Sequence, residues 1–190
     1  MKKMERRSFL AAAVAALPVG LLPVALRGQS SGTTSTKKAV HVPEGEDRLG
    51  EHHSIGVNTT AFKVLTEDSG GGLFVIQHAS LKKGGPPRHL HHNEDEWFYV
   101  LEGNYIVEVG TERFELKAGD SLLGPRGVPH AFTYAGEGPG RLLIAFAPAN
   151  KMEAFFRDNE KGFKAGAYVN DAAIYHTYGM ELVGPPLSVG

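Results

Sequence analysis

From residue 55 onward, apolar and polar residues alternate in short runs that are separated by turn signals. Alternation with a period of two is typical of strands that bury one face. The turn signals are clusters of Gly, Pro, Asn, Asp and Ser, for example at residues 68–72 and 136–140. Strands are therefore expected at residues 60–65, 73–79, 97–102, 105–109, 112–116, 121–123, 131–134 and 141–147. Many short strands with this spacing indicate a β-sandwich or a barrel.

The pattern changes to a helical one after Pro148. Residues 152–157 space their apolar side chains for one or two helical turns. Asp171 is suited to cap a second helix, which is expected to run to about Gly179. The expected fold class is thus all-β, with a barrel over residues 55–148. Short C-terminal helices over residues 149–190 are expected to pack on it.

Residues 1–28 are expected to be an export signal. A basic head that contains Arg6 and Arg7 precedes an apolar run over residues 9–26, which is the layout of a signal peptide. The head reads Glu-Arg-Arg-Ser-Phe-Leu and resembles the twin-arginine signal of bacterial export, so a periplasmic location is predicted. A retained membrane anchor is the alternative, because the run approaches the ~18 residues that can span a bilayer. Residues 29–54 then form a linker and a possible edge strand.

Composition narrows the range of functions. The chain has 190 residues, of which 42% are hydrophobic and 22% charged, as in an ordinary globular protein. Its net charge is −1, but residues 1–27 hold five of its 20 basic residues and one of its 21 acidic ones, so the remainder has a net charge of about −5. Because no basic patch with interleaved aromatic residues remains, nucleic acid is not an expected partner. The absence of cysteine excludes disulfides and thiolate ligands.

The candidate chemistry is concentrated in residues 84–103. This stretch holds three histidines and three acids: His89, His91, His92, Glu94, Asp95 and Glu96. His89 and His91 are two residues apart, so on an extended chain both rings point to one face. A second stretch, residues 119–130, ends in His130. Mid-row divalent metals favour imidazoles with one carboxylate, so a site with three histidines and one carboxylate is expected. Charge alone does not decide which carboxylate is the ligand.

The spacing of these residues resembles that of the cupins. The first cupin motif is matched by His89, His91, Glu96 and Gly103, and the second by Gly119, Pro125, Gly127 and His130. Two departures are Gly84, which is one residue nearer to the first histidine than the pattern asks, and Tyr134, which replaces a common asparagine. The resemblance covers about residues 55–186 and implies a double-stranded β-helix, the jelly-roll barrel of cupins. It also implies a divalent transition metal, one of Fe, Mn, Ni, Co, Cu or Zn, held by His89, His91, Glu96 and His130.

Other polar residues of these stretches are expected to lie outside the ligand set. His92 points to the opposite strand face from His91, towards solvent or an interface. Glu94 and Asp95 are expected to be solvated loop carboxylates. His52 and His53 are expected at the surface, as adjacent residues on a strand point to opposite faces. His78 shares a strand face with apolar neighbours, so it either points into the barrel near the metal or is a hydrogen-bonded core residue.

Three functions remain open. The tail, residues 181–187, resembles the closing segment of single-domain, quercetin 2,3-dioxygenase-like cupins, which implies an oxygenase acting on a small enol or flavonol-like aromatic substrate. Glu96 would then both bind the metal and act catalytically by taking the substrate proton. Phe98, Phe132 and Tyr134 could line an aromatic pocket or fill the core. The alternatives are a non-redox isomerase or lyase and a non-catalytic cupin that binds a small molecule or metal. The resemblance also implies a homodimer.

Overall fold

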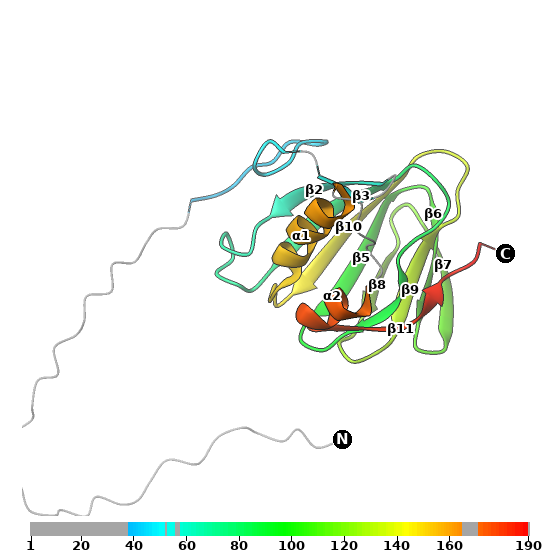
Figure 1. Ribbon diagram of the computed structural model, residues 1–190. Helices are drawn as coiled ribbons and strands as arrows, with labels where there is room; N and C mark the ends of the chain where they lie inside the picture. Colours follow the sequence, from blue (N-terminus) through cyan, green and yellow to red (C-terminus); the bar gives the residue numbers. More distant parts are fainter. Residues whose placement is uncertain (1–37, 52, 56–57, 165–170, 190) are drawn as a thin grey trace, which may run out of the picture. The chain divides into compact units, whose positions relative to one another are not determined.

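Two antiparallel β-sheets form the framework of the protein in the computed structural model (Figure 1). The structure describes residues 38–51, 53–55, 58–164 and 171–189. The chain divides into two units, residues 1–36 and 37–190, and the predicted export signal lies outside the described residues. Within the described ranges, no helix combines the length and apolar character needed to cross a membrane.

One sheet has six strands in the order β1-β2-β3-β10-β5-β8, and the other has five in the order β11-β4-β9-β6-β7. The strands of the first sheet are β1 (His53–Ile55), β2 (Asn58–Val64), β3 (Phe74–Ser80), β10 (Gly140–Ala147), β5 (Asp95–Glu102) and β8 (Ser121–Gly124). Those of the second are β11 (Met180–Pro186), β4 (Pro87–His91), β9 (His130–Tyr134), β6 (Asn104–Val109) and β7 (Glu112–Lys117). The predicted all-β, jelly-roll fold class with short C-terminal helices is confirmed.

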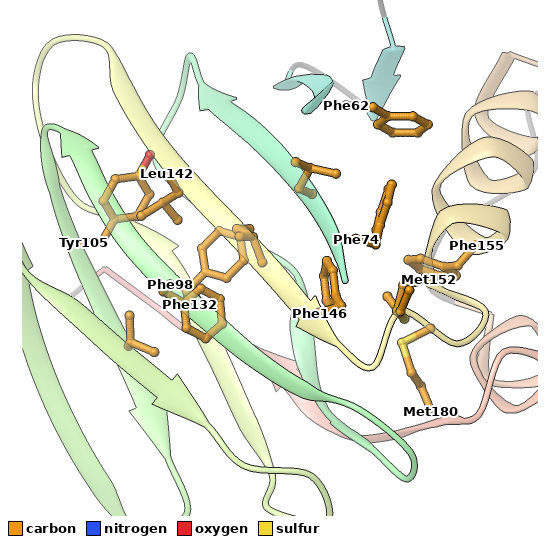
Figure 2. Packing of buried hydrophobic residues seen from close by; sticks show 14 of the residues in the cluster. Phe62, Phe74, Phe98, Tyr105, Phe132, Leu142, Phe146, Met152, Phe155 and Met180 are labelled. Carbon is orange, nitrogen blue, oxygen red and sulfur yellow. The ribbon is translucent and has the colours of Figure 1, made fainter. Parts of the chain in front are cut away.

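The alternation along the strands places the core between the sheets. In β3, every second residue from Phe74 is buried, and β10 shows the same pattern. Phe98 of one sheet packs against Phe132 of the other (Figure 2). Their ring centroids are 5.7 Å apart. Both rings are buried, and each side chain of this size contributes roughly 1.5–3 kcal/mol to stability when removed from water.

Two helices follow the last barrel strand. Helix α1 (Met152–Lys164) places Met152 and Phe155 beside Phe74 and Phe146 at one end of the core (Figure 2). It is longer than the predicted segment 152–157. Helix α2 (Ala172–Thr177) begins after Asp171, whose side chain accepts a hydrogen bond from the Ala173 amide, so the predicted cap is confirmed.

Three strands were not among the predicted runs: β1, β4 and β11. β4 is short and rich in His, Pro and Arg, which gives little strand signal. β11 contains Gly and two Pro residues, which are tolerated because it lies at a sheet edge. The C-terminal extension therefore ends in a strand that pairs with β4, with Met180 opposite His91. Residues 38–43 form no strand, and the edge of the six-stranded sheet is β1.

The connection from β3 to β4 crosses closely over β9. Gly84 and Tyr134 exchange backbone hydrogen bonds of 3.3 and 2.9 Å. At Gly85, a Cβ atom would lie 1.8 Å from the carbonyl oxygen of Phe132. Only glycine therefore fits at this crossing, and β4 reaches its place beside β9 through this contact.

Candidate metal centre

Three histidines converge on the inner face of the five-stranded sheet. His89 and His91 alternate inward along β4, and His130 is the first residue of β9. The pairing of β4 with β9 sets His89 opposite His130. The turn before β9 is anchored to β4, because the Gly127 amide donates to the His91 carbonyl at 2.7 Å.

Glu96 approaches from the other sheet. It lies near the start of β5, where alternation points it inward with Phe98 and Val100. One potential ligand atom from each of His89, His91, Glu96 and His130 lies within 4.8 Å of the other three, and all four residues are buried. We refer to these four residues as the His/Glu group. It is the set that the cupin resemblance implies, and it is brought together across the two layers of the barrel.

The Nε2 atoms of the histidines face the Glu96 carboxylate. Oε2 of Glu96 lies 2.8 Å from His130 Nε2, 3.1 Å from His91 Nε2 and 3.9 Å from His89 Nε2. Ligand atoms bound at ~2.1 Å around one ion lie roughly 3.0–3.4 Å apart in octahedral or tetrahedral geometry. The distances in the group are thus of the size that a single divalent ion needs.

The far ring nitrogen of each histidine is also held. Nδ1 lies 2.8 Å from the Pro87 carbonyl oxygen in His89 and 3.0 Å from the Val128 carbonyl oxygen in His130. In His91, Nδ1 lies 2.7 Å from Oε1 of Glu94. These oxygens can accept from Nδ1–H, and in the neutral tautomer that does so each ring directs its Nε2 lone pair to the interior. Each histidine of the group is therefore oriented through its far ring nitrogen, as metal-binding histidines commonly are.

The electrostatics of the group favour a bound cation. Burial lowers the pKa of His89 to about 3, which keeps its imidazole neutral. For His91, burial by itself would lower the pKa, but the interactions with Glu94 and Glu96 outweigh burial and raise the pKa to about 9. For Glu96, burial by itself would raise the pKa, but the hydrogen bonds and positive charge of His130 and His91 hold the pKa well below its usual range. The carboxylates that favour a positive charge on His91 would equally favour a metal ion there.

The prediction for Glu94 was wrong. Its side chain is fully buried rather than solvated, and its second oxygen accepts from the Asn150 side chain at 3.0 Å. The signal was present in the sequence, because Glu94 and Glu96 are two apart and so project to the same side of an extended chain. Sequence reasoning missed the acceptor that orients His91.

The neighbours of Glu94 do point away from the centre. His92 is exposed, and its closest acid is Glu181 at 3.7 Å, as the surface prediction required. Asp95 lies on the outer side of β5 and forms an ion pair with Arg126 at 2.9 Å. Hydrogen bonds from Arg126 hold the pKa of Asp95 at about 2. Asp95 is therefore a paired surface carboxylate rather than a freely solvated one.

Two other histidines, His78 and His53, are also buried. His78 projects into the barrel, 5.6 Å from the Phe132 ring, and lies outside the His/Glu group. Its Nε2 has no hydrogen-bond partner among the described residues. His53 is 4% exposed, stacks on Phe62 and places Nδ1 2.6 Å from Glu160, so its predicted surface position was wrong. His52 lies outside the described residues.

Aromatic rings surround the group. Phe146 lies 5.7 Å from the His91 ring, and Phe98 lies 6.2 Å from the His130 ring. Tyr134 packs against Tyr105, four residues along β9 from His130 and so ~13 Å away along the strand. The substitution of Tyr134 for the common asparagine therefore affects the far end of the barrel rather than the wall beside the group.

The donor set fits a transition metal. Three neutral imidazole nitrogens and one carboxylate are the ligands that Mn, Fe, Co, Ni, Cu and Zn accept, and Ca²⁺ and Mg²⁺ prefer sites made of oxygen atoms. Among the described residues this is the one group of at least three such side chains with that spacing. The residues present therefore fit the implied metal.

Comparisons with known proteins agree with this geometry. Residues 78–146 match the family model described as "Cupin domain". The chain is 33% identical over 65 residues to the uncharacterized protein MJ1618 of Methanocaldococcus jannaschii, covering 34% of this chain and 52% of that protein. It is 30% identical over 98 residues to the tetracenomycin polyketide synthase protein TcmJ of Streptomyces glaucescens, covering 50% of this chain and 64% of that protein. The chain thus spans between half and two thirds of these curated relatives.

A similar solved structure is an RmlC-like cupin from Shewanella frigidimarina. It is 23% identical, with a TM-score of 0.48, over 62% of this chain and 98% of that chain. The family match runs from residue 78, near the end of β3, to residue 146, the last residue but one of β10, and it includes all four members of the His/Glu group. Residues 78–146 thus match the cupin domain in sequence, and this match contains the whole His/Glu group.

Proposed function

We propose that the protein is a metal-dependent cupin enzyme with dioxygenase-like chemistry on a small enol or aromatic substrate. The observation that carries the proposal is the His/Glu group itself. Its four buried residues direct their ligand atoms to one place, and each histidine is fixed through its Nδ1 atom. Pre-oriented neutral imidazoles are what a resident metal requires, and they offer little to the packing of a core.

The residues of the chain have distinct proposed roles. His89, His91 and His130 hold the ion, and Glu96 both holds it and takes the proton of the substrate hydroxyl. When bound, the metal supplies a Lewis acid and, if redox-active, a means of activating dioxygen. Burial favours the neutral form of Glu96, whereas its hydrogen bonds to His130 and His91 favour the carboxylate. The balance between these effects sets how readily Glu96 accepts a proton.

The aromatic surroundings support the choice of substrate class. Phe98 and Phe146 border the group, and both are buried. Such walls exclude water, which strengthens the electrostatic interactions inside the site, and they suit a flat, conjugated substrate.

The test begins with metal content. Protein purified from each of several metal-supplemented cultures is expected to hold about one transition metal ion per chain. His89→Ala, His91→Ala and His130→Ala are each expected to lose most of it, because one donor is removed from a four-ligand site. Glu96→Gln is expected to lose less metal than activity. His92→Ala is the matched control, since its ring is exposed, and should retain both.

Oxygen uptake then separates the functions. The metal-loaded protein is given a panel of flavonols and small enols in an oxygen electrode, and substrate-dependent uptake is expected. Conversion of a substrate without oxygen consumption would instead indicate an isomerase or lyase. Stoichiometric metal without turnover of the panel would favour a binding protein. A wild-type protein that binds no transition metal would refute the proposal.

A further inference from the structure

Asn150 lies in the short loop between β10 and α1, where the C-terminal extension begins. Among the described residues it is the one residue other than glycine with a positive φ, at 41°. Residues with a side chain rarely adopt this conformation, and asparagine is one of the few that tolerate it. Such a conformation persists only where surrounding contacts hold it, and it is frequent at functional sites. The contacts of Asn150 therefore indicate what the conformation serves.

The side chain of Asn150 joins this loop to the turn between β4 and β5. Its Nδ2 atom donates to the carbonyl oxygen of Asn93 at 2.9 Å and to Oε2 of Glu94 at 3.0 Å. Asn150 is exposed and Glu94 is fully buried, so the amide reaches the carboxylate from the surface. Both hydrogens of the amide nitrogen are thus used on this one turn of the chain.

The hydrogen bonds of Glu94 lead from Asn150 to the metal centre. An amide nitrogen can only donate, so Oε2 of Glu94 accepts there, and Oε1 stays directed at His91 Nδ1, 2.7 Å away. The other ring nitrogen of His91, Nε2, lies 3.1 Å from Glu96 inside the His/Glu group. Asn150, Glu94 and His91 therefore form an unbroken line of contacts from the surface to the centre.

We propose that Asn150 is a positioning residue of the metal centre, which holds Glu94 in the orientation that directs His91 at the ion. His89 and His130 need no such support, because their Nδ1 atoms face backbone carbonyls. The inference rests on the metal centre of the proposed function, but it does not depend on which reaction the centre catalyses. It makes the metal affinity of the group depend on the loop where the C-terminal extension begins.

Asn150→Gly in the full chain, titrated with Co²⁺ against a chelating dye, tests this role. Glycine adopts a positive φ without strain, so the variant is expected to fold, with a thermal midpoint near that of the wild type. Co²⁺ binding should weaken about five-fold, which is less than the roughly 10–100-fold loss expected when the direct partner of a ligand histidine is removed. The visible spectrum of bound Co²⁺, which reports ligand geometry, should also shift.

A merely structural role would have a different signature. It would lower the thermal midpoint of the variant and leave the Co²⁺ spectrum unchanged. Asn150→Asp provides a second variant, because aspartate tolerates the same backbone conformation but its carboxylate cannot donate to Glu94. It should show the same kind of spectral shift, even if the glycine variant does not fold.

Two comparisons separate this role from a general effect on the turn. Arg126 also donates to the Asn93 carbonyl, at 3.1 Å, but its other hydrogen bonds at this turn go to Asp95 rather than to Glu94. Arg126→Gln should therefore neither weaken Co²⁺ binding nor shift the spectrum. In a Glu94→Gln background, the loss caused by Asn150→Gly should not add, because the carboxylate through which it acts is already gone.

The outcomes distinguish the inference from the proposed function. An unchanged Co²⁺ affinity and spectrum in the Asn150 variants would overturn the inference. An equal loss in Arg126→Gln, or additive losses in the double variant, would overturn it as well. A wild type that binds no Co²⁺ would instead refute the metal centre itself.

Discussion

Individual side chains around the His/Glu group decide how it is oriented. Two of the three histidines rest on backbone carbonyls, of Pro87 and Val128, which no side-chain substitution removes. The third, His91, rests on Glu94, which is a side chain and therefore open to mutation. Orientation of a ligand by an outer hydrogen bond commonly changes metal affinity by about 10–100-fold.

We therefore predict that Glu94→Gln weakens binding of Zn²⁺ or Co²⁺ about ten-fold. The amide still accepts a hydrogen bond from His91, but the negative charge that favours a cation at this place is lost. Competition with a chelating dye measures the dissociation constant. Asp95→Asn is the control, because Asp95 lies on the outer side of the strand and pairs with Arg126. Equal affinities in Glu94→Gln and Asp95→Asn would contradict the role assigned to Glu94.

His78 is predicted to make the stability of the protein depend on pH. Burial lowers its pKa from 6.5 to about 4. The unfolded chain therefore binds a proton at His78 more readily than the folded protein does. The stability that neutral His78 contributes above pH 6.5 is lost as the pH falls towards 4. This shift in the pKa of His78 corresponds to a change of about 3 kcal/mol at most in the free energy of unfolding.

Urea unfolding of the wild type and His78→Leu at several pH values measures this effect. The variant removes the titrating group and keeps an apolar side chain of similar size, so its free energy of unfolding should fall less between pH 6.5 and 4. Parallel pH profiles for the two proteins would show that His78 is not held neutral by burial.

Among the secondary-structure elements, β4 depends on contacts beyond its own residues. Its short sequence places His89 and His91 on one face, but its position is set by pairing with β9 and β11. The loop that leads into it crosses β9 at Gly85, where the backbones nearly touch. Correct placement of the two histidines therefore requires a glycine at a position that the cupin motifs do not specify.

Gly85→Ala is predicted to destabilise the protein by more than about 3 kcal/mol or to prevent folding. Its Cβ would lie 1.8 Å from the Phe132 carbonyl oxygen and 2.8 Å from the carbonyl carbon, and neither backbone atom can move without disturbing β9. Gly138→Ala is the control, because nothing lies within 4 Å of an added Cβ there. Thermal unfolding compares the two, and a similar midpoint for both variants would mean that the crossing can open at little cost.

For the molecule as a whole, export and assembly remain proposals. Replacing Arg6 and Arg7 with Lys is expected to keep the protein in the cytoplasm, because the twin-arginine route reads that pair. Fractionation of cells followed by immunoblotting locates the protein. Normal export of the double variant would exclude the twin-arginine signal, and membrane association of the wild type would favour the retained anchor.

We also propose a homodimer formed through the edge of the six-stranded sheet at β1, since exposed edges invite pairing. Light scattering at micromolar concentration should give a mass of about two chains, and a monomer would exclude the dimer. The opposite edge provides a comparison. Leu123 of β8 is 50% exposed beside Trp97, and Leu123→Glu should leave a β1-mediated dimer intact.

The identity of the four residues of the His/Glu group and most strands of the barrel could be predicted from the sequence. The strands follow from a local rule, because side chains alternate between the two faces of a strand. The choice of Glu96 as the carboxylate came from the resemblance to the cupin motifs, since charge alone left it open. The positions of Glu94 and His53 could not be predicted, since their burial depends on distant partners, Asn150 and Glu160. Tyr175 likewise reaches His89 only because α2 folds back over β4. Such contacts depend on how the two sheets and the C-terminal extension pack together, which no local spacing in the chain specifies.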